Sequence, residues 1–157
     1  MLDAGAKAPE FVLNDHEGRE TSLSDLLQAG PLILYFYPAD FTPGCTKEAC
    51  SIRDIHDDIQ SVGLTVAGIS PQNEESHQRF RDEHDLPFVL LSDPEKTAIK
   101  MYDVDGPFGV GVRRATFLIS QDREIKDAVM ADVLIGRHKE FIEKAVILRE
   151  TAGLKSS

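Results

Sequence analysis

Cysteine is scarce in this sequence: among 157 residues, only Cys45 and Cys50 carry a thiol. Two cysteines cannot form the disulfide scaffold of a chain of this length. A domain of this size buries roughly two-thirds of its unfolded surface and folds without a disulfide or a metal. In a reducing compartment, a cysteine pair is more often catalytic, redox-sensing or metal-binding than structural. The question of function therefore concentrates on these two residues.

Long hydrophobic runs and an excess of basic residues are also missing. The longest apolar run, residues 31–38, is far shorter than the ~20 residues of a membrane helix. Residues 1–9 lack the basic and apolar regions of a signal peptide. The 17 basic and 27 acidic residues give a formal net charge of −10, which repels polyanions. We therefore expect a cytoplasmic protein that binds neither membranes nor nucleic acids.

The chain has an ordinary balance of 41% hydrophobic and 28% charged residues. This balance is typical of a globular protein and excludes disorder and collagen-like repeats. Buried-strand patterns alternate with helix patterns, which predicts an α/β fold with a central mixed β-sheet flanked by helices. We expect a single domain over residues 1–157 with a frayed tail at about 153–157. The expected strands are 11–13, 32–37, 64–70, 88–91, 114–120 and 124–131, and the expected helices are 22–27, 45–61, 73–84, 93–102 and 137–151.

Cys45 lies at a predicted helix N-terminus. It follows a buried strand and the turn Thr42-Pro43-Gly44, which places it in the first turn of the next helix. Backbone N–H groups there have no partner inside the helix and the helix dipole is positive, so both favour thiolate, the nucleophilic form of cysteine. The alternative is a structural cysteine that packs as a small hydrophobic side chain. The turn favours the preorganised, reactive sulfur.

Cys50 lies five residues further along the same predicted helix. On an ideal helix this spacing corresponds to about 140° of rotation and roughly 7.5 Å of rise, which separates the Cα atoms by about 8.6 Å. A disulfide tolerates at most about 7 Å without backbone movement. The two sulfurs can therefore bond only if the N-terminus of the helix unwinds. The apolar stripe leaves Cys50 outside, beside Asp54 and Asp57, and a chance surface cysteine is the alternative.

Five histidines accompany the two cysteines and raise the question of a metal site. Their spacings fit no common zinc pattern, and the spacing C-x₄-C differs from the C-x₂-C of zinc sites. We therefore expect no metal and no other cofactor. The histidines are expected on the surface or on helix faces.

The residues around Cys45 resemble those of a known family. Pro38, Thr42 and Cys45 have the order and spacing of the peroxiredoxin signature, a Pro followed by a Thr four residues on and a Cys three residues further. The run Y-F-Y-P-A-D-F-T-P-G-C-T-K-E-A-C resembles the bacterioferritin comigratory protein or peroxiredoxin Q branch, an atypical two-cysteine group. Supporting pieces at 8–11, 68–70, 91–93 and 114–119 extend the resemblance over nearly the whole chain. One departure is Ser120, where many relatives have Asp.

The resemblance implies a thioredoxin-like fold and a cofactor-free thiol peroxidase that reduces hydrogen peroxide and small organic hydroperoxides. Cys45 would be the peroxidatic cysteine, Thr42 would hydrogen-bond the sulfur and the peroxide, and Pro38 would shield the site. Cys50 would be the resolving cysteine that forms an intramolecular disulfide with Cys45. Arg114 matches the family arginine near the sulfur. Thioredoxin or a similar dithiol would then reduce the disulfide.

Further expectations concern the arginine and the oligomeric state. Adjacent strand residues point to opposite sides, so only one of Arg113 and Arg114 can face the sulfur, and the resemblance to the family implies that it is Arg114. Glu48 matches a commonly acidic position of the helix. No cysteine follows Cys50, so we do not expect an intersubunit disulfide near the C-terminus. We therefore expect a monomer.

Two other functions use the same residues. A general thiol–disulfide oxidoreductase would normally contain C-x-x-C, which this chain lacks. A non-enzymatic redox sensor would pass its oxidation to a partner, and a holdase-type chaperone belongs to the same non-enzymatic class. The sensor shares the Cys45 chemistry, so the sequence does not separate it from the enzyme.

Overall fold

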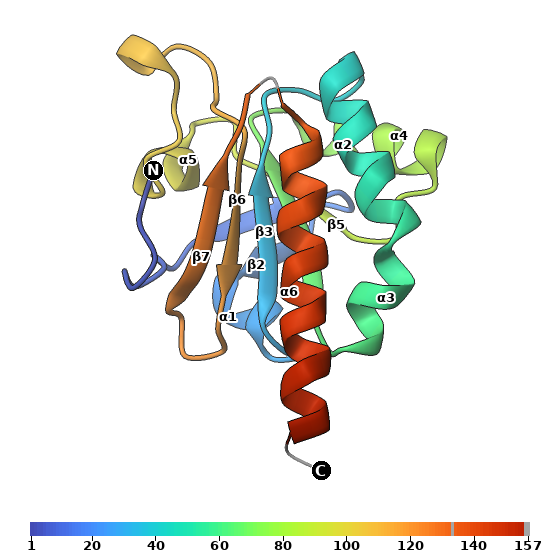
Figure 1. Cartoon of the computed structure of the whole chain (residues 1–157). Coiled ribbons are helices and arrows are strands. Elements are labelled where there is room, and N and C mark those ends of the chain that lie inside the picture. The colour runs from blue at the N-terminus through green and yellow to red at the C-terminus, as the bar shows by residue number, and fades with distance from the viewer. Residues whose placement is uncertain (133, 156–157) are drawn as a thin grey trace.

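The computed structural model describes residues 1–132 and 134–155, and a mixed β-sheet forms its centre (Figure 1). The strands are β1 (Val12–Asp15), β2 (Glu20–Ser22), β3 (Leu32–Phe36), β4 (Thr65–Ser70), β5 (Val89–Ser92), β6 (Ala115–Ile119) and β7 (Ile125–Met130). Their order in the sheet is β2-β1-β5-β4-β3-β6-β7. β3, β4 and β5 are parallel, whereas the outer strands join them in antiparallel pairs. The predicted mixed sheet is confirmed.

Helices cover both faces of this sheet (Figure 1). They are α1 (Leu23–Leu27), α2 (Pro43–Asp54), α3 (His56–Ser61), α4 (Glu74–His84), α5 (Thr97–Met101) and α6 (Gly136–Lys155), with a short 3-10 turn at Pro107–Gly109. Buried residues of α2, α3, α4 and α6 share one apolar cluster, and those of α1 and α5 share another. The α2 and α6 layer lies on the face where β3 presents Ile33 and Tyr35.

β3 is the strand from which the site is built. All five of its residues are buried, as the continuous apolar run predicts for a strand covered on both faces. Its side chains alternate between the two clusters, with Ile33 and Tyr35 on one face and Leu32, Leu34 and Phe36 on the other. The carboxyl end of β3 leads directly into the loop before α2, and therefore places that loop at the edge of the sheet.

Two predicted helices differ from the structure. The helix expected over 45–61 is broken at Ile55, whose φ of −111° and ψ of 11° lie outside the helical region. Beyond the break, His56 and Ile59 are both buried. The helix expected from residue 93 begins only at Thr97, because the Asp93 carboxylate accepts hydrogen bonds from the main-chain N–H groups of Thr97 and Ile99 at 2.8 and 2.9 Å.

The ends of other elements also differ from expectation. β2 was not predicted, and it pairs with β1 around the turn that ends at Gly18. α6 continues to Lys155, four residues beyond the expected end at 151. Residues 156–157 of the expected tail lie outside the described residues.

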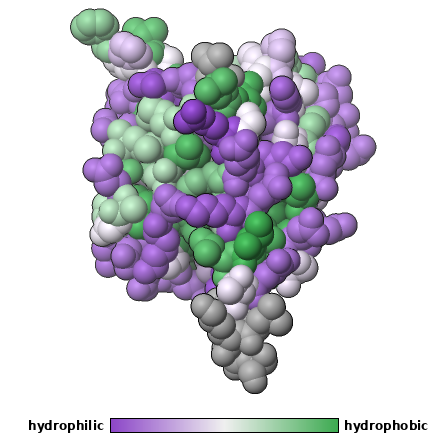
Figure 2. Space-filling model, in the orientation of Figure 1, coloured by the Kyte–Doolittle hydropathy of each residue, from purple (hydrophilic) through white to green (hydrophobic). Residues whose placement is uncertain are grey.

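Much of the visible surface is hydrophilic, with smaller apolar areas (Figure 2). The loop around residues 107–110 projects from the body, and its Phe108 and Val110 side chains are exposed (Figure 1). Ile147 and Leu148 on α6 are also exposed. Among the described helices, none combines the length and the apolar character that crossing a membrane requires.

Candidate active site

The chain starts a helix immediately after the loop that follows β3. Thr42 is the residue before α2, and Pro43 occupies its first position, where the missing N–H of proline is not needed. Cys45 therefore lies in the first turn of α2, as predicted, and its residue is only 2% exposed. The unpaired N–H groups and the positive end of the helix dipole act on this sulfur.

Arg114 brings a positive charge to the same sulfur. It precedes β6, and the pairing of Phe36 with Ala115 aligns it with the end of β3. Its Nη2 donates a hydrogen bond to Cys45 Sγ at 3.3 Å, and the residue is buried. Arg113 faces solvent and pairs with Asp132 at 2.7 Å. The structure therefore places Arg114, and not Arg113, at the sulfur.

Gly44 leaves room for this contact. A Cβ atom at position 44 would lie 3.0 Å from Ile135 Cδ1 and 3.2 Å from Arg114 Nη2. Both separations are tighter than ordinary van der Waals contact. A larger residue at 44 would push the guanidinium away from the thiol, so the turn needs glycine for close approach rather than for a positive φ.

Glu48 is the second partner of Arg114. It lies one turn after Cys45 on α2, is 1% exposed, and accepts a hydrogen bond from Arg114 Nη1 at 2.8 Å. Burial raises the pKa of the Glu48 carboxyl to about 7, although Arg114 opposes the rise. Burial acts against the charge of Arg114, but Glu48 and Cys45 hold the pKa of its guanidinium above the ordinary value. The guanidinium therefore keeps its charge while bridging thiol and carboxyl.

His138 closes this cluster from α6, and sequence reasoning did not select it. The side chain is buried, with Nε2 2.9 Å from the Ala131 carbonyl and Nδ1 2.8 Å from Thr116 Oγ1. Nδ1 also lies 3.5 Å from Glu48 Oε2. Burial lowers the pKa of the imidazole. A signal was present in the sequence, because His138 and Ile142 are four residues apart and share the buried face of α6.

The loop before α2 carries Pro38 and Thr42. Pro38 is half-buried, directly after β3 and Tyr37, and Thr42 is exposed. Thr42 Oγ1 donates to the carbonyl of Ala39 at 3.1 Å, so among the described residues it bonds within the loop and does not cap α2. Both residues lie in the loop that leads to Cys45, and among the described residues the Thr42 hydroxyl bonds to Ala39 rather than to the sulfur.

Cys50 is half-buried and, like Cys45, is a free thiol. The helical pattern predicts an outward-facing Cys50. The residue is more buried than that prediction but less buried than its neighbour Ala49. Both cysteines belong to the unbroken helix α2, which ends only at Asp54. The unwinding required for a Cys45–Cys50 disulfide therefore concerns the first turns of α2.

The histidines lie mostly inside the protein rather than at its surface. His16, His56, His77 and His138 are buried. Within the described ranges, no group of three or more His, Cys, Asp or Glu side chains could hold a metal ion. His77 and His138 are held by hydrogen bonds in the core, which spacing along the chain does not show.

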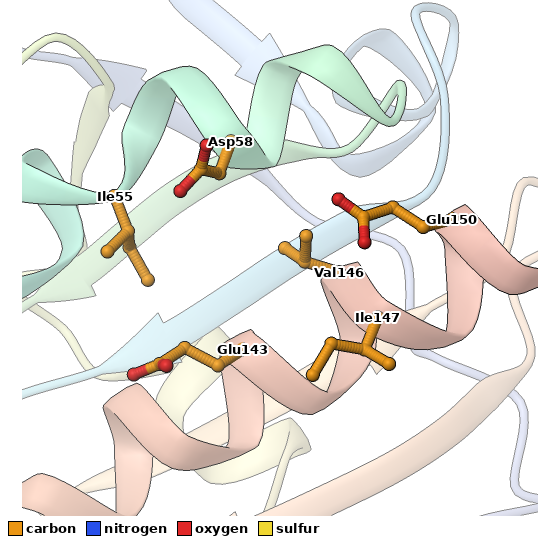
Figure 3. A pocket seen from close by; sticks show the side chains of 6 residues that line it. All are labelled: Ile55, Asp58, Glu143, Val146, Ile147 and Glu150. Atoms are coloured by element: carbon orange, nitrogen blue, oxygen red, sulfur yellow. The ribbon is translucent and has the colours of Figure 1, made fainter.

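A surface pocket lies between α3 and α6, away from the thiols (Figure 3). It has a volume of about 240 Å³, and neither cysteine lines it. Three carboxylates and three apolar side chains form its wall: Ile55, Asp58, Glu143, Val146, Ile147 and Glu150. Without a thiol or a cation in its lining, this pocket does not provide the chemistry found around Cys45.

Comparisons with known proteins agree with this geometry. The AhpC/TSA family matches residues 4–128. The chain is 43% identical over 143 residues to a putative peroxiredoxin Bcp of Coxiella burnetii, covering 87% of this chain and 93% of that protein. It is 40% identical over 133 residues to the peroxiredoxin Bcp of Bacillus subtilis, covering 80% of this chain and 84% of that protein.

Solved structures show the same relationship in three dimensions. The peroxidoxin BcpB of Mycobacterium tuberculosis superposes with a TM-score of 0.88 at 32% identity, over 94% of this chain and 98% of that one. A Xanthomonas campestris bacterioferritin comigratory protein has a TM-score of 0.80 at 26% identity, over 88% and 90%. The predicted thioredoxin-like peroxiredoxin fold is confirmed. The chain belongs to the AhpC/TSA family, as a thiol peroxidase related to the Bcp and peroxiredoxin Q proteins.

Proposed function

We propose that Cys45 is the peroxidatic cysteine and that Cys50 resolves its oxidised form. The observation that carries this assignment is the Arg114 guanidinium, which donates to Cys45 Sγ at 3.3 Å. The second nitrogen of its fork is held by Glu48 at 2.8 Å. A buried cation fixed in this way stabilises negative charge at the sulfur and at an oxygen that approaches it. Cys50, the other thiol, lies on the same helix.

The first step transfers oxygen from the peroxide to sulfur. The Cys45 thiolate attacks the terminal oxygen of a hydroperoxide, so that an S–O bond forms and the O–O bond breaks. The leaving oxygen carries the negative charge and takes up a proton to become water or an alcohol. Sulfur is oxidised by two electrons to sulfenic acid. Arg114 and the N–H groups at the start of α2 are the proposed donors to the reacting oxygens, and Pro38 shields the site. Thr42 joins these donors when its hydroxyl turns from the Ala39 carbonyl to the peroxide.

The second step forms the disulfide. Cys50 as thiolate attacks the Cys45 sulfenic sulfur; an S–S bond forms, the S–OH bond breaks, and hydroxide leaves as water after protonation. On an intact helix the two Cα atoms are about 8.6 Å apart, so the first turns of α2 must unwind. An external dithiol, which we propose to be thioredoxin, then exchanges with the disulfide, restores both thiols and becomes oxidised itself.

Hydrogen peroxide and small organic hydroperoxides are the proposed substrates. The Xanthomonas campestris relative is described through its alkyl peroxide reduction activity, which supports the organic class. We further propose that the protein acts in the cytoplasm and as a monomer. The monomer is supported by the cysteine count, because the sequence has no third cysteine for a second, intersubunit bridge. Light scattering of the reduced protein after size-exclusion chromatography tests the monomer; a stable larger species would contradict it.

Lys47 allows a direct test of the thiol roles. Because Lys47 lies between the cysteines, trypsin separates them into different peptides unless a disulfide joins them. After one equivalent of peroxide, mass spectrometry of the wild-type protein should show the two peptides linked. A persistent sulfenic or sulfinic acid on Cys45 would instead refute the resolving role of Cys50.

Single-cysteine variants complete this test. Cys50→Ser should consume about one equivalent of peroxide without dithiol and then stop, because its sulfenic acid has no resolving partner. Cys45→Ser should consume none. Full thioredoxin-coupled turnover by Cys45→Ser would overturn the proposal. A stoichiometric oxidation followed by a stable mixed disulfide with one partner would indicate a sensor.

A further inference from the structure

The loop Pro38–Thr42 must keep its shape although its backbone is unfavourable. Phe41 has a φ of +64°, in the left-handed region that a bulky L-residue rarely adopts. Such conformations persist where the surrounding structure holds them in place. Pro38 and Thr42 flank this residue closely, so whatever holds the loop also sets where these two side chains lie.

The Asp40 side chain is the strongest anchor of this loop. Tyr37 Oη donates to Asp40 Oδ1 at 2.7 Å, and Ser76 Oγ donates to Asp40 Oδ2 at 2.7 Å. His77 Nδ1 donates to the same Oδ2 at 2.7 Å, and both partner side chains, Asp40 and His77, are completely buried. Hydrogen bonds to a buried carboxylate are short and strong. Asp40 is therefore fixed by three donors, two of which come from α4.

His77 ties this anchor to the sheet. Its other ring nitrogen, Nε2, lies 3.1 Å from the carbonyl oxygen of Leu91 in β5 and 3.5 Å from Ser70 Oγ in β4. One imidazole therefore connects the loop, through Asp40, to the ends of two parallel strands. The first turns of α4 cannot shift without moving either the loop or these contacts.

Phe41 adds an apolar contact to the same helix. Its ring packs edge-on against Phe80 at a centroid distance of 5.2 Å, and the Arg79 guanidinium lies 5.6 Å from its centroid. The positive φ of Phe41 thus turns its side chain toward α4, while the buried Asp40 carboxylate is held by its hydrogen bonds. Two consecutive loop residues are therefore held by α4, Asp40 through hydrogen bonds and Phe41 through its ring.

This arrangement matters because α2 has to unwind and the loop before it has to stay. If the loop moved with the first turns of α2, Pro38 and Thr42 would lose their places in every catalytic cycle. We propose that Asp40, held by His77, is a positioning residue that fixes the loop on α4 while the start of α2 unwinds. The inference rests on the proposed roles of Cys45 and Cys50, and it assigns Asp40 and His77 no contact with the peroxide.

The two reaction steps provide the test, because the anchor should act on them differently. Rapid mixing with peroxide, acid quench and mass spectrometry separate the rate of Cys45 oxidation from the rate of disulfide formation. In Asp40→Asn the loop loses its charged anchor, and the oxidation rate should fall by about tenfold or more. Disulfide formation should not slow, since α2 unwinds at least as easily. A merely structural defect would lower both rates or the reactive fraction.

Two substitutions of His77 make a matched pair. An asparagine amide can replace the Nδ1–H donor to Asp40, whereas a glutamine amide reaches the position of Nε2 and leaves Asp40 without this donor. His77→Asn should therefore keep the oxidation rate within about threefold of wild type, and His77→Gln should show most of the loss seen in Asp40→Asn. His84→Gln, on the same helix but outside the anchor, is the control and should behave as wild type.

The possible outcomes separate this inference from the proposed function. Equal oxidation rates in His77→Asn and His77→Gln, or an Asp40→Asn rate within about twofold of wild type, would overturn the positioning role. If Asp40→Asn does not fold, as circular dichroism would show, the His77 pair decides alone. Absence of Cys45 oxidation in the wild-type protein would refute the proposed function itself, whatever the variants do.

Discussion

Two buried polar clusters flank the start of α2, and they differ in how completely their hydrogen bonds are made. On the sulfur side, Arg114 bridges Cys45 and Glu48, yet Arg114 Nε and Glu48 Oε2 have no hydrogen-bond partner among the described residues. On the loop side, Asp40 receives three donors at 2.7 Å, two of them on one oxygen. Both clusters are buried, so the difference does not come from access to water.

The incompletely bonded cluster is the one that contains the reactive sulfur, and the fully bonded cluster is the one that supports the loop. Buried polar atoms without partners are unfavourable, and native proteins keep few of them. Tyr35 Oη, also without a hydrogen-bond partner in the described chain, lies on β3 beneath the sulfur cluster, and burial, with Glu48 and Cys45, raises the pKa of its phenol well above the ordinary value. The sulfur side therefore holds charge at some expense in stability, whereas the loop side is satisfied and keeps its geometry.

Removal of Arg114 should break this comparison most strongly. Arg114→Ala takes the cation from both Cys45 and Glu48, and the rate of Cys45 oxidation should fall by about 10²–10³, as for the loss of one preorganised donor. Stopped-flow competition for peroxide against a reporter enzyme measures this rate.

Arg113→Ala is the matched control for this change. The Arg113 side chain is 42% exposed and pairs with Asp132, so its loss should leave the rate within about twofold of wild type. If the two alanine variants lose activity equally, the Arg114 guanidinium has no special role at the Cys45 sulfur. The contrast between the two clusters then disappears.

The titration of Glu48 should appear in the pH dependence of stability. Its pKa rises from 4.5 to about 7 on burial, so the folded protein binds a proton that the unfolded chain has lost. The stabilising contribution is complete below pH 4.5 and is lost as the pH rises through about 7. Relative to Glu48→Gln, the wild-type protein should lose about 3 kcal/mol of unfolding free energy over this window.

Urea denaturation of both reduced proteins from acid to neutral pH measures this difference. Comparison with Glu48→Gln removes the contributions of the other titrating groups, which the two proteins share. The difference should be constant above the window, because Glu48 is then ionised in both states. Parallel stability curves for the two proteins would show that Glu48 does not titrate as an isolated buried carboxyl, and the sulfur cluster would then be as fully satisfied as the loop cluster.

His138 tests how far the sulfur cluster extends into α6. His138→Ala removes the partner of Thr116 Oγ1 and of the Ala131 carbonyl, and the protein should lose about 1–3 kcal/mol of stability. His138→Gln, whose amide reaches the position of Nε2, should recover part of this loss. Thermal unfolding of the two variants provides the measurement; equal losses would mean that the contact of Nε2 with the Ala131 carbonyl contributes nothing to stability.

The sulfur side could be predicted from the sequence further than the loop side. The Thr42-Pro43-Gly44 turn places Cys45 in the first turn of α2; strand alternation allows only one of Arg113 and Arg114 to face the sulfur, and the resemblance to the family selects Arg114. The helix start and the alternation are local backbone rules, which hold wherever the element forms. Periodicity also gave the central strands and the order of the helices.

Contacts between distant segments could not be predicted in this way. Asp40 and His77 are 37 residues apart, and they meet only because the loop after β3 and the start of α4 reach the same edge of the sheet. The spacing of residues along α4 cannot show that His77 has a partner in another segment. From the sequence alone, a histidine on such a polar helix is therefore expected at the surface. The break at Ile55 is likewise invisible in a pattern whose apolar positions continue across it.

The smallest expected effect tests whether the loop cluster tolerates the loss of one donor. Ser76→Ala removes a single hydrogen bond to Asp40 Oδ2 and leaves Tyr37 and His77 in place. Stability should fall by about 1 kcal/mol, and the rate of Cys45 oxidation should stay within about threefold of wild type, because two donors still hold the carboxylate. Tyr37→Phe, which removes the donor to Oδ1, is the matched variant. If Ser76→Ala lowered the rate of Cys45 oxidation as much as Arg114→Ala does, the two remaining donors would not be enough to hold Asp40. The two clusters would then be equally sensitive to the loss of a single hydrogen bond.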